Sequence, residues 1–135
     1  MPSYMWFHPA LGALTIALIF TAFALNAGRH KAGTLHSVVG GLAGLSGLAA
    51  FAVAWWAVGR WGLQLPWPGN LHFVLAALTL GLLLAQVALG LAVHFVLGGP
   101  PRFLRFHRRL ARVLVVVAAV TLLLGLATAS RLMYF

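Results

Sequence analysis

The chain has 135 residues, of which 63% are hydrophobic, and its mean hydropathy is +1.03. Soluble domains are only about 45–50% apolar, so the composition predicts a single transmembrane domain over residues 1–135. The sequence contains no cysteine and no Asp or Glu, which excludes disulfides, zinc–thiolate sites, carboxylate metal sites, paired-acid hydrolases and Ser-His-Asp triads. Nine Lys and Arg residues give a formal net charge of +9. Because they fall between apolar stretches, we expect them to face anionic lipid headgroups and not nucleic acid.

Four apolar stretches follow one another, at about residues 5–26, 33–58, 69–97 and 103–130. The first has 22 residues. As a helix it would rise about 33 Å, enough to cross a hydrocarbon layer of about 30 Å. Clusters of Gly and Pro at 66–69 and 98–101 separate the later stretches, and Gly28 is placed to end the first. Short connections make neighbouring helices antiparallel, which predicts an all-α integral membrane protein, an up-down-up-down four-helix bundle.

The basic residues divide unequally between the two ends of this predicted bundle. Seven belong to the first and third connections or their flanks, and these are Arg29, Lys31, Arg102, Arg105, Arg108, Arg109 and Arg112. Only Arg60 and Arg131 fall at the other end. Since positive charge is retained on the cytoplasmic side, we expect both termini on the non-cytoplasmic side of a prokaryotic inner membrane.

One histidine stands near the start of each predicted helix. These are His8, His36, His72 and His107, separated by 28, 36 and 35 residues. Antiparallel packing places His8 and His72 near the outer face, and His36 and His107 near the cytoplasmic face. In a four-helix ring the members of each pair lie diagonally opposite, so a planar haem with two axial imidazoles fits between them. The sequence predicts two haem b groups, with irons about 20 Å apart along the membrane normal.

Small residues leave room for these groups. Gly40, Gly44 and Gly47 follow His36 at i+4, i+8 and i+11 on one helical face, where a porphyrin can lie on the backbone. Gly90 and Gly125 stand at i+18 from His72 and His107, which returns to the ligand face near the opposite membrane surface. Close helix packing is the alternative reason for the Gly40 and Gly44 spacing.

Other basic side chains are candidates for the inner site. Arg29, Lys31, Arg105 and Arg108, with Arg109, can hold haem propionates or an anionic donor, although positive-inside topology explains the same cluster equally well. His94 lies 22 residues after His72, about 40° off its face, and is the rival ligand for the inner haem. His30 falls in the basic turn and is expected to be a solvated loop residue.

The pattern of histidines resembles the four-helix core of the cytochrome b561 family, over nearly the whole chain. His8-Pro9 is similar to the His-Pro opening of that core, and Leu71-His72 retains part of its outer motif. Ala24-Leu25 followed by Arg29 and Lys31 is similar to the apolar-then-basic segment that the family links to ascorbate, and Gln86 and Gly90 resemble residues of the same helix. The resemblance implies a di-haem protein whose ligands pair first with third and second with fourth.

The chain also departs from that family. Animal and plant members usually have six helices, the tyrosine of the ascorbate segment is replaced by Gly28, and the outer motif lacks its serines and tryptophan. Ascorbate, a quinol and a protein therefore all remain open as the donor.

The function expected from these features is electron transfer across the membrane between a small-molecule or protein donor and acceptor, as an electron carrier or transmembrane oxidoreductase without a catalytic residue of its own. A non-redox subunit or scaffold that binds quinone or lipid is the alternative, and a haem transporter or sensor is a third. The sequence leaves the direction of electron flow and the oligomeric state open.

Overall fold

The fold is given by a computed structural model, which describes residues 7–27, 33–61, 69–95 and 100–133. Four α-helices make up these ranges, α1 (Phe7–Ala27), α2 (Gly33–Trp61), α3 (Gly69–Phe95) and α4 (Pro101–Met133). Each is long and apolar enough to cross a membrane. The prediction of an all-α bundle of four membrane-length helices is confirmed.

The start of α4 differs from the position expected from the sequence. The helix begins at Pro101, whereas the sequence suggested residue 103. Proline suits the first helical position because an N–H there would have no partner within the helix. The carbonyl oxygen of Pro100 accepts hydrogen bonds from the backbone N–H groups of Phe103 and Leu104, at 3.0 and 3.2 Å. Pro101 is therefore the first residue of the helix, and Pro100 accepts the hydrogen bonds of its first turn.

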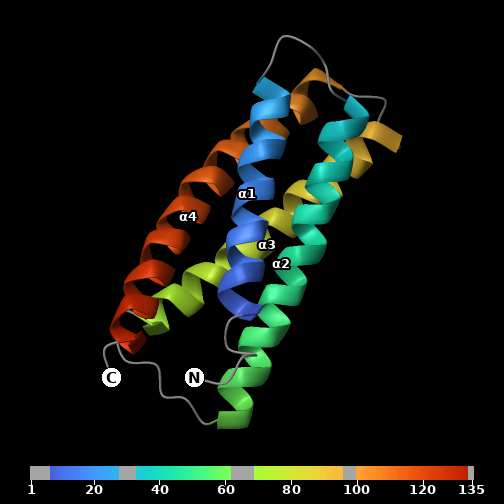
Figure 1. The fold of residues 1–135 in the computed structure, drawn as a ribbon. Helices are drawn as coiled ribbons and strands as arrows, with labels where there is room; N and C mark the ends of the chain where they lie inside the picture. Colours follow the sequence, from blue (N-terminus) through green and yellow to red (C-terminus); the bar gives the residue numbers. More distant parts are fainter. Residues whose placement is uncertain (1–6, 28–32, 62–68, 96–99, 134–135) are drawn as a thin grey trace.

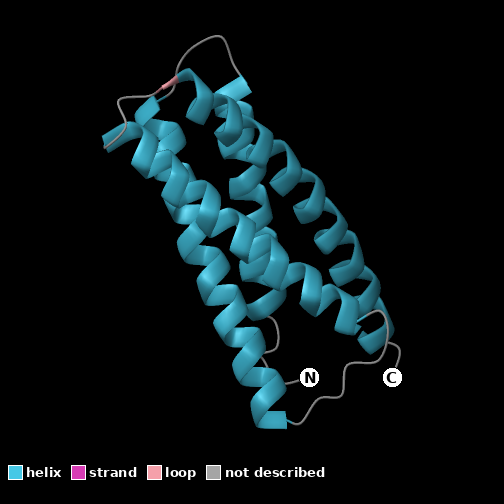
Figure 2. Ribbon diagram, turned by 180° about the vertical axis from the view of Figure 1, so that it is seen from behind, coloured by secondary structure: helices cyan, strands magenta, loops and turns pink. Residues whose placement is uncertain are grey.

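The bundle consists of two helical hairpins. α1 packs most extensively against α2, and α3 against α4, while the α2–α3 and α1–α4 contacts join the hairpins into a ring. Among the described residues, no Cα atom of α1 lies within 8 Å of one in α3, and the same holds for α2 and α4. α1 begins and α4 ends at the same end of the bundle (Figure 1), and the view from behind shows the same arrangement (Figure 2). Diagonal helices can therefore meet only through side chains.

Alanine, hydroxyl-bearing and a few aliphatic side chains fill the interior, whose core cluster includes Ile19, Leu83 and Leu114, and many large apolar side chains face outward. Ala43 and Ala118 are fully buried, whereas Trp55 is 64% and Phe95 74% exposed. This distribution suits a bundle in lipid, where small interior residues let helices approach closely and bulky ones contact acyl chains. The buried hydroxyls are paired within the bundle. Thr79 bonds Thr121 at 2.9 Å, and Thr15 bonds Ser46 at 2.7 Å.

The buried residues of all four helices occupy the same positions relative to the histidine of their own helix. Of the sixteen buried residues in the described ranges, twelve lie 7, 11 or 14 positions after His8, His36, His72 or His107. These twelve are Thr15, Ile19, Ala22, Ala43, Gly47, Ala50, Thr79, Leu83, Gln86, Leu114, Ala118 and Thr121. Steps of 7, 4 and 3 residues stay on one face of an α-helix. Each histidine therefore shares its face with the buried core of its own helix.

Candidate functional site

The four histidines meet in two pairs, one near each end of the bundle. The ring centroids of His8 and His72 lie 6.1 Å apart with the planes at 72°, and those of His36 and His107 lie 6.1 Å apart at 84°. The distance between the two histidine pairs along the bundle follows from α1. This helix carries His8 of the first pair and also Ala22, whose carbonyl contacts His36 of the second pair. Fourteen residues of helix rise about 21 Å.

Main-chain carbonyls hold three of the four rings. The Nδ1 atom of His8 lies 3.0 Å from the carbonyl oxygen of Ala50, and that of His36 lies 2.9 Å from the carbonyl oxygen of Ala22. His72 Nδ1 lies 3.0 Å from the carbonyl oxygen of Thr121. A carbonyl only accepts, so Nδ1 carries a proton in each case, which in a neutral ring leaves Nε2 with a free lone pair. This is the tautomer of an imidazole that binds a metal through Nε2.

His107 is held differently. The side-chain nitrogen of Gln86 lies 3.1 Å from His107 Nε2 and also donates to the main-chain carbonyl of His107 at 3.1 Å. Two buried polar atoms then have no partner among the described residues, His107 Nδ1 and Gln86 Oε1. An unsatisfied buried polar group costs about 1–3 kcal/mol of folding free energy, so this arrangement of Gln86 and His107 lowers the stability of the folded chain.

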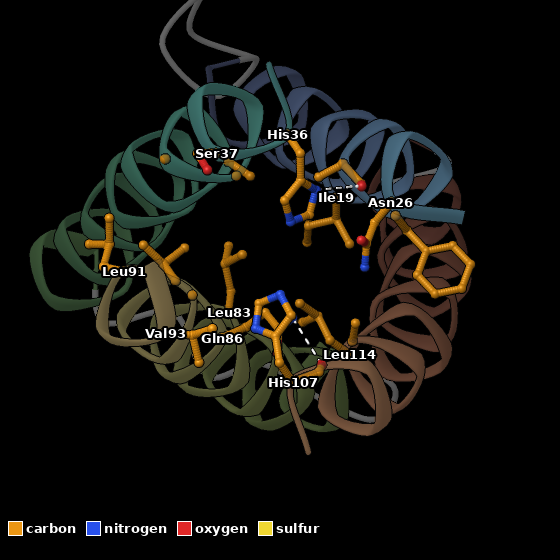
Figure 3. A pocket seen from close by; sticks show the side chains of 18 of the residues that line it. Ile19, Asn26, His36, Ser37, Leu83, Gln86, Leu91, Val93, His107 and Leu114 are labelled. Carbon is orange, nitrogen blue, oxygen red and sulfur yellow. Dashed lines mark hydrogen bonds between the residues drawn. The ribbon is translucent and has the colours of Figure 1, made fainter. Parts of the chain in front are cut away.

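A cavity of about 530 Å³ surrounds the inner pair and is lined by residues of all four helices. Figure 3 shows His36 and His107 pointing toward each other across it, with Gln86 beside His107. Gly40 lies in the wall, and a Cβ atom there would meet nothing within 4 Å. The volume lies within the range of about 300–1,000 Å³ that is typical of cofactor and ligand sites.

The other predicted glycines pack against specific neighbours. A Cβ at Gly90 would stand 3.2 Å from His107 Cε1, and one at Gly125 would stand 2.9 Å from His72 Cε1. Gly90 and Gly125 thus make room for the imidazole rings themselves. Gly44 faces α3, with Val87 3.7 Å from a Cβ there, and Gly47 lies between α3 and α1, with Leu83 and Thr15 each 3.3 Å from a Cβ at that position.

The remaining candidates lie outside these contacts. His94 lines the rim of the cavity, but it is exposed and its ring packs edge-on against Phe95 at 4.6 Å. Arg105 and Arg108 are exposed and do not line the cavity. Like Arg102, Arg109 and Arg112 near the start of α4, they lie about 100–220° around the helix from His107. Arg29, Lys31 and His30 fall outside the described residues.

The geometry of the pairs can be compared with that of a metal held between two imidazoles. A metal–nitrogen distance of about 2.0 Å on each side places the two ring centroids about 6.3 Å apart, close to the spacing seen in both pairs. In the described part of the chain no three His, Cys, Asp or Glu residues cluster as ligands for a bare ion. Two opposed imidazoles suit a metal whose other ligands come from a macrocycle, and so the residues present fit a haem.

Sequence reasoning did not identify the groups that hold the rings, Ala22, Ala50, Thr121 and the side chain of Gln86. A signal for them existed, because each lies 14 positions after one of the four histidines.

Comparison of the chain with models of protein families, with curated proteins and with solved structures finds no match.

Proposed function

We propose that the chain carries electrons across a membrane through two b-type haems, one between His8 and His72 and one between His36 and His107. The observation that supports this most directly is the 6.1 Å spacing of both imidazole pairs, with a free Nε2 on three of the four rings. A bound haem supplies a one-electron Fe(III)/Fe(II) couple. The pairs lie about 21 Å apart along α1, so one would lie toward each face of the membrane.

The residues of the chain would bind and orient the two groups. Four imidazoles would hold the two groups, and the main-chain carbonyls of Ala22, Ala50 and Thr121 would keep the Nδ1 proton of three of them in place. Two histidines per iron leave no open coordination position, so we expect electron transfer without oxygen binding. The inner site would meet a small-molecule or protein donor on the cytoplasmic side, and the outer site an acceptor on the other side.

The proposal is tested by the reduced-minus-oxidised visible spectrum of the purified protein and by its haem content per chain. We expect two low-spin b-type haems. His36→Ala should remove the inner haem and His8→Ala the outer one, each variant keeping the other. A colourless protein that cannot be reconstituted with haem would contradict the proposal and favour a non-redox subunit. Loss of both haems or neither in the single variants would contradict the pairing.

A further inference from the structure

Three of the four histidines are held by the same relation between the two helices of a hairpin. The acceptor for His8 is Ala50, which lies 14 residues after His36, and the acceptor for His36 is Ala22, which lies 14 residues after His8. In the second hairpin the acceptor for His72 is Thr121, 14 residues after His107. The same relation assigns His107 to position 86, 14 residues after His72, where the sequence has glutamine.

At this fourth position a side chain takes the place of the main-chain contact. Gln86 is buried, and its amide nitrogen lies 3.1 Å from His107 Nε2, the nitrogen that a haem iron would need. The two polar atoms that have no partner are one hydrogen-bond acceptor and one donor. Gln86 Oε1 can only accept a hydrogen bond and His107 Nδ1 is free to donate one, and both are buried without a partner among the described residues.

We infer that Gln86 is the positioning residue of His107, its Oε1 atom accepting a hydrogen bond from the Nδ1–H group when Nε2 binds iron. The inference rests on the proposed function. An Nε2 atom bound to a metal has no lone pair left for the Gln86 amide, so the contact at 3.1 Å must break. A turn of the amide, which also gives up the bond from its nitrogen to the main-chain carbonyl of His107, would then pair the two unpartnered atoms in one hydrogen bond. The His107 ring lies against Gly90, one helical turn beyond Gln86 on α3, which keeps it within reach of this side chain.

The inner and outer sites therefore differ in a defined way. His8, His36 and His72 depend on carbonyls of the helical backbone, which no substitution removes. His107 depends on a replaceable side chain. Partners that orient a ligand histidine typically change metal affinity by about 10- to 100-fold when they are removed, and a more basic partner makes the ligand more electron-donating.

The test uses the His8→Ala background, in which only the inner site remains, so that haem affinity and midpoint potential are measured on one site. Gln86→Leu, which is similar in size, should lower inner haem affinity by about 10- to 100-fold and raise the potential. Gln86→Glu should retain haem and lower the potential, because a carboxylate is a stronger acceptor than an amide. Thr79→Val is the matched control. Thr79 is a buried polar residue on the same face of α3, seven positions before Gln86, but its hydroxyl bonds Thr121 and no imidazole, so inner haem affinity and potential should be unchanged.

Helix content and oligomeric state of each apoprotein show whether the variant is folded. A folded Gln86→Leu protein with unchanged inner haem affinity, potential and low-spin electron paramagnetic resonance signal would overturn the role of Gln86 and leave the proposed function intact. Shifts of the same sign in the Leu and Glu variants would also overturn it. If the unmodified protein binds no haem, the proposed function fails and this role fails with it.

Discussion

At the scale of single residues, depth along the helix and ring contacts select the histidines that meet. His94 shares the inner cavity with His36 and His107, and its distance along α3 made it a rival ligand. Its ring is exposed and packs on Phe95, whereas the His107 ring is half-buried and lies 6.1 Å from His36. An imidazole already opposite its partner needs no rearrangement of the backbone to bind a common iron.

Single substitutions distinguish the roles of His94 and His107. We expect His94→Ala to retain two haems per chain, because the His94 ring is exposed and packs on Phe95. His107→Ala should retain one haem, the outer one. Both are measured by haem content and the reduced-minus-oxidised spectrum of the purified variants. Retention of both haems in His107→Ala together with loss of one in His94→Ala would show that His94 is the inner ligand.

At the scale of helices, α3 and α4 accommodate each other's histidines through glycine. His72 of α3 packs on Gly125 of α4, and His107 of α4 packs on Gly90 of α3. Each glycine lies 18 residues, five full turns, after the histidine of its own helix. A side chain at either position would enter the space of an imidazole ring. The ring positions therefore depend on small residues in the neighbouring helix.

This dependence can be measured at Gly125. A Cβ there would stand 2.9 Å from His72 Cε1, so Gly125→Ala should displace the ring and lower outer haem affinity by about 10-fold or more. Gly81→Ala is the control, since a Cβ at Gly81 meets nothing within 4 Å. It should leave both haems bound and stabilise the helix by up to about 1 kcal/mol. Haem titration and thermal unfolding of both variants provide the measurement. Equal haem affinity in the two variants would contradict this role of Gly125.

α4 presents chemically different faces near its start. His107 is half-buried beside the cavity, whereas five arginines are exposed on the other faces of the helix: Arg102, Arg105, Arg108, Arg109 and Arg112. Long arginine side chains on an outward face can extend toward lipid headgroups, and toward the N-terminal end of their helix. The start of α4 therefore carries a potential ligand on the face toward the cavity and five guanidinium groups on its other faces.

At the scale of the whole molecule, the bundle is two hairpins whose histidines meet across the space between them. The helices of each hairpin pack closely, and the contacts between hairpins are fewer. A flat group placed between diagonal helices would therefore contact both hairpins. Five of the six arginines of α4 lie at the end that holds His36 and His107, which predicts one preferred orientation in a membrane.

The orientation is open to a direct test, because the sequence carries no cysteine of its own. Ser130 and Arg102 are exposed near opposite ends of α4. In intact spheroplasts, a membrane-impermeant maleimide should label Ser130→Cys at once, and Arg102→Cys only after permeabilisation. This result is expected because the side with more Lys and Arg is retained in the cytoplasm. The reverse labelling pattern would place the His36 and His107 end outside.

What the sequence determined by itself is the set of helices and the depth of each histidine. Apolar length, Gly and Pro punctuation and short connections are local properties, and they sufficed to predict four antiparallel helices with His8 and His72 at one end and His36 and His107 at the other. Even there, the start of α4 at Pro101 depended on backbone pairing at its first turn.

Only the tertiary structure decided how each ring is held. The contacts of Nδ1 with Ala50, Ala22 and Thr121 depend on the rotation of each helix about its axis and on the side-chain rotamer, and a sequence specifies neither directly. The same is true of the glycines, where Gly90 and Gly125 meet imidazoles while Gly44 and Gly47 meet a neighbouring helix. The distinct environment of His107 beside Gln86 arises from packing between α3 and α4, because two residues 21 positions apart meet only when their helices do.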